Sequence, residues 1–412
     1  MCIIICTIVI FRSKINKMKD KSAQSRDRML ALYDAAPYPE VLQSSLPQTT
    51  ALLSHWINAV SAYGTPALSN SSKILVAGCG SGAEVFMLAN LFPEAKVVGI
   101  DFSERSIAKA KELALTSTLS NIRFEVADLM SADCKSYDSM DFILCHGVAD
   151  YVSDPGILMQ TLAGCLSEEG VIYMTANSPY HPAGRIRDAF SALGIPPEAF
   201  TDSPDQRLLL QLITQLMGTD AKLLGLGTAP KAYLDVDIFP PIAHHDSMET
   251  WCRHAEEAGL YFSGSMDAPI GLLQLSDEQL PMLYKLGKAE LSQWLANIYQ
   301  RPGMQLLFSR KKLNEPNFEL PALWDWHPRL DACLGLLPEL DEDPNQLRSL
   351  TLRFQGLPDF VINSTAYDLE ILRRCEGKLS LGQIRKSLAV DGNTDSLVAC
   401  LYRAYHYGLL SD

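Results

Sequence analysis

The chain reads Ile74-Leu-Val-Ala-Gly78-Cys-Gly80-Ser-Gly82-Ala83 at a point where a buried strand is expected to turn into a helix. The strand is predicted over residues 73–80 and the helix over 83–91. Glycine has no Cβ, so a turn rich in glycine lets a ligand approach the backbone at the start of a helix. The stretch predicts an α/β domain with a ligand-binding turn, although a tight turn without a ligand remains an alternative.

Apolar runs and helical patterns alternate along the rest of this region. Strands are expected over 96–102, 122–128, 140–147 and 170–177, with helices over 104–115 and 155–166 between them. This βαβ alternation predicts a parallel, doubly wound sheet. Two later apolar runs, 260–265 and 304–311, would extend the sheet to seven strands.

Two aspartates end successive strands of this predicted sheet. Asp101 follows the glycines at a distance where a carboxylate can accept hydrogen bonds from the hydroxyls of an adenosine ribose, and Phe102 beside it can flank a purine. Asp128, next to Leu129, can accept from the exocyclic amine of adenine. A single aspartate is usually a cap or a turn former, but two at neighbouring strand ends predict an adenosine-binding crevice.

The composition narrows the ligands and partners. A net charge of −13 opposes binding to phosphate backbones, so no nucleic-acid partner is expected. The ten cysteines include no C-x-x-C pair, which predicts reduced thiols in the cytoplasm and no metal site. The apolar run 2–11 spans roughly 15 Å as a helix, too short to cross a membrane. Either Met18 is the true start, or this run is a weak membrane anchor.

The glycine loop and the two aspartates together resemble the class I S-adenosylmethionine-dependent methyltransferases. The resemblance rests on Gly78-x-Gly80-x-Gly82, Asp101 and the pair Ala127-Asp128, and it covers residues 73 to about 180. It implies that S-adenosylmethionine is the cofactor and that Gly78, Gly80, Gly82, Asp101, Phe102, Asp128 and Leu129 bind it. Many members carry an acidic residue two positions before the first glycine, where this chain has Val76. Contact to the cofactor's amino group must then come from elsewhere.

Three further segments resemble bacterial protein lysine methyltransferases that carry a methyltransferase regulatory domain. They are Tyr33-Asp-Ala-Ala-Pro-Tyr38-Pro39, Cys145-His146-Gly147-Val148-Ala-Asp-Tyr151 and Arg185-Ile-Arg187-Asp188. The likeness implies a Tyr-Pro segment folded over the cofactor, a helical middle domain and a helical C-terminal domain. The acceptor that it implies is a protein lysine, while a small molecule remains an alternative.

Two side chains are candidates for catalysis. Methyl transfer needs alignment and a deprotonated nucleophile, so few catalytic groups are required. His146 follows the fourth strand, where it could take a proton or position the acceptor, or simply bond to backbone. Tyr38 and also Tyr151 could line the path of the methyl group or face the sulfonium, with aromatic packing as the alternative.

The chain is expected to contain helical parts in addition to the sheet. We expect a seven-stranded Rossmann-like methyltransferase sheet with a helical insert and a small, mainly helical C-terminal domain. The expected segments are an N-terminal extension (1–25), a cofactor-binding domain with the Tyr-Pro segment (26–180), a helical insert or lid (181–259), the end of the methyltransferase domain (260–311), a linker (312–356) and a winged-helix-like domain (357–412).

The predicted C-terminal domain favours contacts with protein over DNA. It carries six basic and seven acidic residues, a net charge of −1, so protein docking or dimerisation is the expected role. For the whole chain, methyl transfer is the leading interpretation. An NAD-dependent oxidoreductase stays open because the loop with Ala83 also fits a dinucleotide fingerprint. A polyamine-synthase-like transferase and a cofactor-binding regulator without turnover also stay open.

Overall fold

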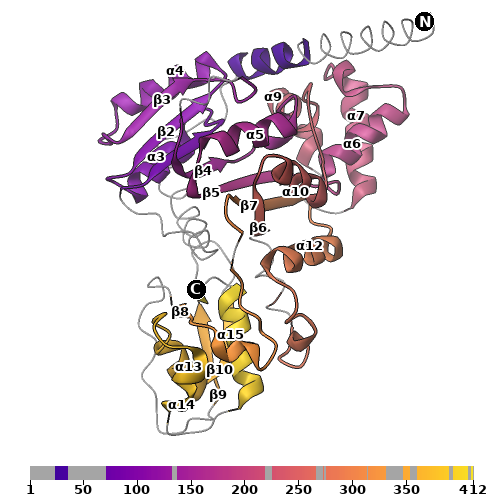
Figure 1. Cartoon of the computed structure of the whole chain (residues 1–412). Coiled ribbons are helices and arrows are strands. Elements are labelled where there is room, and N and C mark those ends of the chain that lie inside the picture. Colours follow the sequence, from indigo (N-terminus) through magenta and orange to yellow (C-terminus); the bar gives the residue numbers. More distant parts are fainter. Residues whose placement is uncertain are drawn as a thin grey trace, which may run out of the picture.

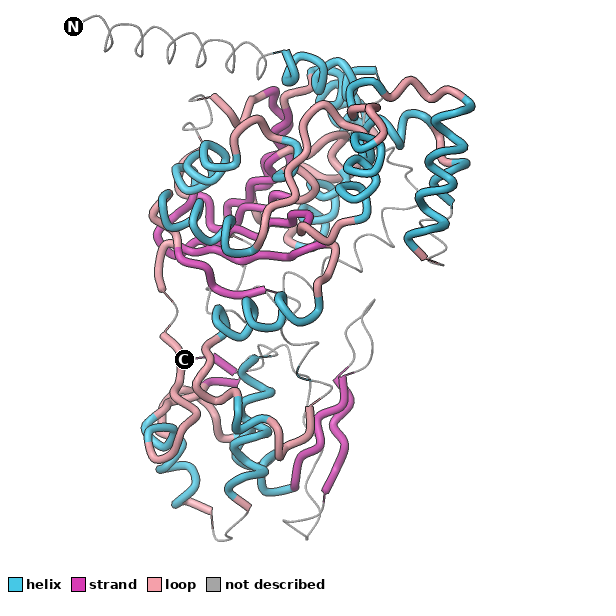
Figure 2. The backbone as a smooth tube through the Cα atoms, turned by 90° about the vertical axis from the view of Figure 1, so that its right-hand side faces the viewer, coloured by secondary structure: helices cyan, strands magenta, loops and turns pink. Residues whose placement is uncertain are grey.

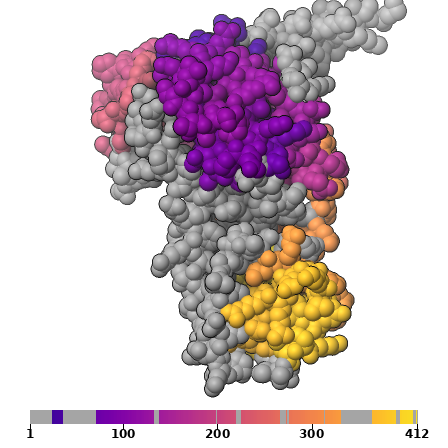
Figure 3. All heavy atoms as spheres, turned by 90° about the vertical axis from the view of Figure 1, so that its left-hand side faces the viewer, coloured from indigo at the N-terminus to yellow at the C-terminus, as the bar shows by residue number. Residues whose placement is uncertain are grey.

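The chain folds into a sheet domain, a helical insert and a C-terminal domain (Figures 1 and 2). The computed structural model describes residues 24–35, 71–131, 137–218, 225–265, 272, 275–312, 314–330, 347–352, 360–388, 393–406 and 410–411. Figure 3 shows the sheet domain, in indigo and magenta, and the C-terminal domain, in yellow, toward opposite ends of one face of the molecule. None of the helices in these ranges is long and apolar enough to cross a membrane.

A seven-stranded sheet forms the centre of the first domain, in the order β3-β2-β1-β4-β5-β7-β6. The strands are β1 (Lys73–Ala77), β2 (Lys96–Asp101), β3 (Ile122–Val126), β4 (Met140–Cys145), β5 (Leu166–Asn177), β6 (Tyr261–Ser265) and β7 (Gly303–Ser309). The first five run parallel, and β7 pairs antiparallel with both β5 and β6. The predicted Rossmann-like methyltransferase sheet is confirmed. Its parallel strands all end at one edge, which is where ligands bind in such folds.

Three crossover helices connect the parallel strands, and two of them begin at a capping side chain. They are α3 (Ala83–Leu91), α4 (Glu104–Leu115) and α5 (Pro155–Cys165). Ser103 caps α4 by accepting from the N–H of Ser106, and Asp154 caps α5 by accepting from two backbone N–H groups. Pro155 at the first turn of α5 suits a position that has no N–H partner. Because α5 ends at Cys165, β5 starts four residues earlier than the sequence predicts.

The helical insert has a core of its own. It contains α6 (Pro182–Ala192), η3 (Pro197–Ala199), α7 (Pro204–Met217), η4 (Gly225–Thr228), α9 (Lys231–Tyr233) and the π-helical turn η5 (Leu234–Ile238). Phe190, Phe200 and Phe239 pack together in it, with the rings of Phe200 and Phe239 stacked 4.0 Å apart. The next helix, α10 (Met248–Glu257), instead buries Trp251 against the sheet. The core of the insert therefore ends near Phe239, before the boundary predicted at 259.

The C-terminal domain includes residues that were predicted to form a linker. Its elements are η7 (Ala322–Asp325), β8 (Arg329–Leu330), β9 (Leu347–Leu352), β10 (Phe360–Thr365), α13 (Ala366–Arg373), α14 (Leu381–Lys386), α15 (Thr394–His406) and β11 (Leu410–Ser411). Phe318 and Trp326, within the expected linker 312–356, pack in the same core as Tyr402 and Tyr405 of α15. This part of the expected linker is folded, because its aromatic side chains cover that core.

The two domains share one helix at their junction. η6 (Leu280–Met282) and α12 (Lys288–Tyr299) follow β6, and Leu291 and Leu295 of α12 belong to the core of the C-terminal domain. Ser292 of the same helix accepts a hydrogen bond from the N–H of Ser265 in β6, at 2.8 Å. Helix α12 therefore joins the sheet to the C-terminal domain (Figure 1).

Candidate functional site

A cavity of about 390 Å³ lies at the carboxyl ends of the parallel strands. Its size is within the range of roughly 300–1,000 Å³ that is typical of small-molecule sites. Among the residues predicted to bind cofactor or act in catalysis, the cavity wall brings together Gly78, Gly80, Asp101, Phe102, Asp128, Leu129 and His146. Tyr151, the second aromatic candidate for the path of the methyl group, also lines it. Tyr38 lies outside the residues that the structure describes.

The glycine turn forms the floor of this cavity beside β1. The N–H groups of Gly78 and Cys79 both donate to the carbonyl of Ile100 in β2, at 2.8 and 2.9 Å. Gly78 has a φ of +74°, and a Cβ on it would lie 2.3 Å from Cγ2 of Val148. The turn can therefore pass this close to the chain after β4 only with glycine at position 78.

Gly82 is the predicted glycine that does not line the cavity. It occupies the N-cap position of α3 with a φ of +95°, and a Cβ there would lie 2.8 Å from the ring of Phe124. Its absent side chain makes room for packing between α3 and β3. Gly82 therefore lies against Phe124 at the start of α3 and allows the close packing of this helix on the sheet.

Asp101 is held rigidly at the end of β2. Its two carboxylate oxygens accept from the N–H of Gly80 and from the N–H of Ser103, both at 2.9 Å. Burial raises the pKa of Asp101, although the hydrogen bonds from Ser103 and Gly80 oppose that rise. The side chain links the glycine turn to the start of α4, so both are fixed at this edge of the sheet.

The helix at residues 24–35 lies over the same edge. Arg26 forms an ion pair with the carboxylate of Asp128, and Tyr33 packs edge-on against Phe102 with ring centroids 5.9 Å apart. Ser103 donates to Asp34 at 2.5 Å and anchors the end of this helix. Arg26 was not predicted from the sequence, because no local pattern connects it with a strand end 102 residues away.

His146 is paired with an acidic residue of α3. Its Nδ1 atom lies 2.8 Å from Oε1 of Glu84, which also lines the cavity. Burial alone would lower the pKa of His146, but the hydrogen bond and the charge of Glu84 outweigh burial and raise it. Glu84 was missed in the sequence, although it comes only two residues after the last glycine of the turn.

The insert supplies the remaining wall, through Val236, Asp237 and Ile242. Asp237 belongs to the π-helical turn η5, and its Oδ2 atom is enclosed without a hydrogen-bond partner in the described parts of the chain. Burial raises the pKa of this carboxyl to about 6. An insert over the strand ends was predicted, but the residue that it would present there was not.

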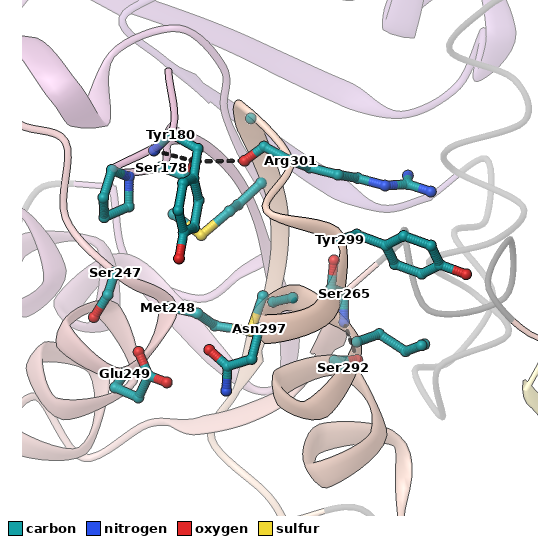
Figure 4. A pocket seen from close by; sticks show the side chains of 15 residues that line it. Ser178, Tyr180, Ser247, Met248, Glu249, Ser265, Ser292, Asn297, Tyr299 and Arg301 are labelled. Atoms are coloured by element: carbon teal, nitrogen blue, oxygen red, sulfur yellow. Dashed lines mark hydrogen bonds between the residues drawn. The ribbon is translucent and has the colours of Figure 1, made fainter. Parts of the chain in front are cut away.

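A second hollow, of about 90 Å³, lies between the end of β5, the start of α10 and α12 (Figure 4). In Figure 4, Ser178 lies between the backbone of Tyr180 and that of Arg301, to which it is hydrogen-bonded. Ser247, Glu249 and Asn297 line the opposite side. This hollow is too small for a nucleoside, whereas the larger cavity fits one.

Comparisons with known proteins agree on the sheet domain. Residues 68–221 match a family model described as a methyltransferase domain. Trans-aconitate 2-methyltransferase of Variovorax paradoxus is 33% identical over 126 residues, which is 30% of this chain and 46% of the relative. Protein-lysine N-methyltransferase EFM4 of Saccharomyces cerevisiae is 33% identical over 95 residues, 23% of this chain and 41% of that protein.

One solved structure is similar over nearly the whole chain. It is PKMT2 from Rickettsia typhi in complex with AdoHcy, with a TM-score of 0.55 and 19% identity, covering 91% of this chain and 77% of that one. The chain spans only part of the relatives that it matches: 57% and 27% of two uncharacterized proteins of Rickettsia prowazekii, and 35% of an uncharacterized protein of Synechococcus. The matched domain, the sheet order and the strand-end cavity agree, and the chain contains an S-adenosylmethionine-dependent methyltransferase domain with the class I fold.

Proposed function

We propose that this protein transfers a methyl group from S-adenosylmethionine to the side-chain amine of a lysine in another protein. The observation that carries methyl transfer is the shared cavity wall that joins the glycine turn, Asp101 and Asp128. A lysine acceptor is supported by the activity for which the yeast relative is named and by the motifs around Tyr33 and His146. The relative from Variovorax is named for a different acceptor, so the acceptor needs its own test.

The residues of the cavity suit the parts of this cofactor. Asp101 would accept from the ribose hydroxyls, and Phe102 and Leu129 would flank the adenine. The glycine turn would lie along the amino-acid portion, where the absence of side chains leaves room. Glu84 is an acidic group beside the turn and can take the role that Val76 cannot, that of holding the amino group.

When bound, the cofactor would supply an electrophilic methyl group. The protein's own contribution is to exclude water, orient the acceptor and remove a proton from it. Glu84 fixes the Nδ1 side of His146 and raises the pKa of the ring, which makes the imidazole a stronger base. His146 is therefore proposed to position the acceptor or take its proton, and Tyr38 and Tyr151 to line the path.

The test is transfer of label from methyl-tritiated S-adenosylmethionine into cell lysate by the purified full-length chain. Label that stays in protein after acid hydrolysis and migrates with methylated lysine supports the proposal. Label that is released as volatile methanol by mild base indicates a carboxyl acceptor, and label in small molecules excludes a protein acceptor. The variant Asp101→Ala serves as the control, because it should lose transfer in every fraction.

A further inference from the structure

The acidic groups of the cavity differ in what compensates their charge. Asp101 accepts two backbone hydrogen bonds, Asp128 is paired with Arg26, and Glu84 is paired with His146. Asp237 has an enclosed oxygen, Oδ2, for which the described residues offer no partner. A buried carboxylate without a partner is costly, and sites that keep one commonly pair it with a cation from a ligand.

The backbone around Asp237 is held in place from two directions. The N–H of Phe239 donates to the carbonyl of Leu234 at 2.8 Å and closes the π-helical turn. The buried guanidinium of Arg187 donates to the carbonyl of Ile238 at 3.3 Å and lies 2.7 Å from Nδ1 of His245. A π-helical turn within a helix often marks a functional position. Here it fixes the residue that precedes Ile238 at the cavity wall.

We propose that Asp237 receives the protonated amine of the methyl acceptor, so that the acceptor class is a cationic amine. The inference rests on the proposed methyl transfer and adds to it the residue that selects the acceptor. A carboxylate acceptor would be repelled by Asp237, which lines the cavity, whereas an ammonium in the cavity would neutralise its charge.

The proposed reaction consists of a proton transfer to Asp237 and a methyl transfer to the amine nitrogen. Burial raises the pKa of Asp237 to about 6 in the unliganded protein. Burial of an amine beside it would lower the pKa of the amine, and this favours transfer of one proton to the carboxylate against the mutual attraction of the two charges. The freed lone pair on nitrogen forms the new N–C bond as the C–S bond of the methyl donor breaks. The electron pair of that bond stays on sulfur, the product leaves as a methylated ammonium that keeps its two remaining N–H protons, and Asp237 releases the proton that it accepted to solvent.

Another cation could be the partner of Asp237, namely the amino group of the cofactor. Asp237 comes from the insert, whereas Glu84 lies on α3 directly after the glycine turn. The two acidic groups would therefore serve two amines, one of the cofactor and one of the acceptor. This distinction can be measured without knowing the acceptor.

The experiment compares two ligands of the full-length chain by calorimetry at pH 7.5. S-adenosylhomocysteine has a neutral thioether, and sinefungin has an ammonium-bearing carbon in place of the methylated sulfur. Asp237→Asn should weaken sinefungin binding about tenfold or more, since a charge-assisted bond is lost, and change S-adenosylhomocysteine binding less than about twofold. Asp235→Asn is the matched control: it lies in the same turn, is paired with Lys231 and does not line the cavity.

The outcomes separate the ideas. Equal losses for both ligands in Asp237→Asn would make Asp237 a cofactor or folding residue and overturn the inference, as would unchanged affinities. An equal effect of Asp235→Asn would do the same. Failure of the wild-type chain to bind either ligand would instead contradict the proposed methyl transfer. The melting temperature of the unliganded variants checks folding, and Asp237→Ala, which also removes the charge, should reproduce the selective loss.

Discussion

His146 Nδ1 lies 2.8 Å from Glu84 Oε1. This contact connects α3, the first helix after the glycine turn, to the segment that follows β4. The pair joins a residue predicted from the sequence to one that was not. Because both residues line the cavity, a change in Glu84 should be detected at His146 and in cofactor binding.

The first prediction concerns the protonation of His146. Burial lowers its pKa and Glu84 raises it by a hydrogen bond and by charge, with a net rise. Glu84→Gln should therefore lower the His146 pKa, because the charge of Glu84 that raises it is removed. NMR titration of the imidazole measures this change, and an unaltered titration curve in the variant would contradict the pairing.

The second prediction concerns Asp101 and the ribose. Asp101→Ala should weaken S-adenosylhomocysteine binding at least tenfold, about 1.4 kcal/mol, since a hydrogen-bonding carboxylate is removed. The same change frees the N–H groups of Gly80 and Ser103, so the variant's fold must be checked by circular dichroism. Wild-type affinity in a folded Asp101→Ala protein would exclude this residue from the site.

The third prediction uses the close contact of Gly78 with Val148. Gly78→Ala should cost more than about 2 kcal/mol of stability, because it combines a positive φ with a clash at 2.3 Å. Gly194→Ala is the control, since Gly194 has a similar φ of +76° but nothing within 4 Å of the position that a Cβ would take. It should cost only about 1 kcal/mol. Urea unfolding measures both, and Val148→Ala should restore part of the loss in Gly78→Ala.

The cofactor side of the cavity could be predicted from the sequence for a physical reason. Parallel strands end at one edge, so Asp101 and Asp128, each at the end of an apolar run, had to come close together. The alternation of apolar runs also placed β1 to β4 within a few residues of their observed ends. Local patterns carry this information because β1, β2 and β4 are largely buried.

The acceptor side could not be predicted in the same way. Asp237 reaches the cavity through a π-helical turn whose position depends on Arg187, and no periodicity in the sequence indicates that contact. Gly82 was assigned to the cofactor because loop glycines look alike in sequence, but Phe124 shows its packing role. Prolines suggested a linker around Phe318, whereas burial of its ring in the C-terminal core is a tertiary effect.

The fourth prediction separates two arginines of α6. Arg185 is exposed, while Arg187 is buried and bonded to Ile238 and His245. Arg187→Ala should lower the free energy of unfolding by about 2–3 kcal/mol, since it leaves buried acceptors without partners. Arg185→Ala should stay within about 0.5 kcal/mol of the wild type. Equal effects of the two substitutions on urea unfolding would show that the buried contacts of Arg187 do not hold η5.

The last prediction concerns Asp150, whose carboxylate accepts from the N–H of Asn177 at 2.8 and 3.0 Å where β5 ends. Burial raises its pKa from 3.8 to about 7, against the hydrogen bond from Asn177. A carboxyl with a raised pKa in the folded state favours folding fully below pH 3.8, and this contribution is lost as the pH rises through 7.

Asp150→Asn keeps an oxygen acceptor for Asn177 but cannot ionise. The variant should therefore be more stable than the wild type at pH 8, by about 1–3 kcal/mol, because the wild type must bury a charge there. At pH 5 the wild-type carboxyl is mostly protonated in the folded protein, so the difference should shrink. Differential scanning calorimetry at the two pH values measures this difference in stability. If the difference in melting temperature between variant and wild type is the same at both pH values, the pKa of Asp150 is not raised in the folded protein.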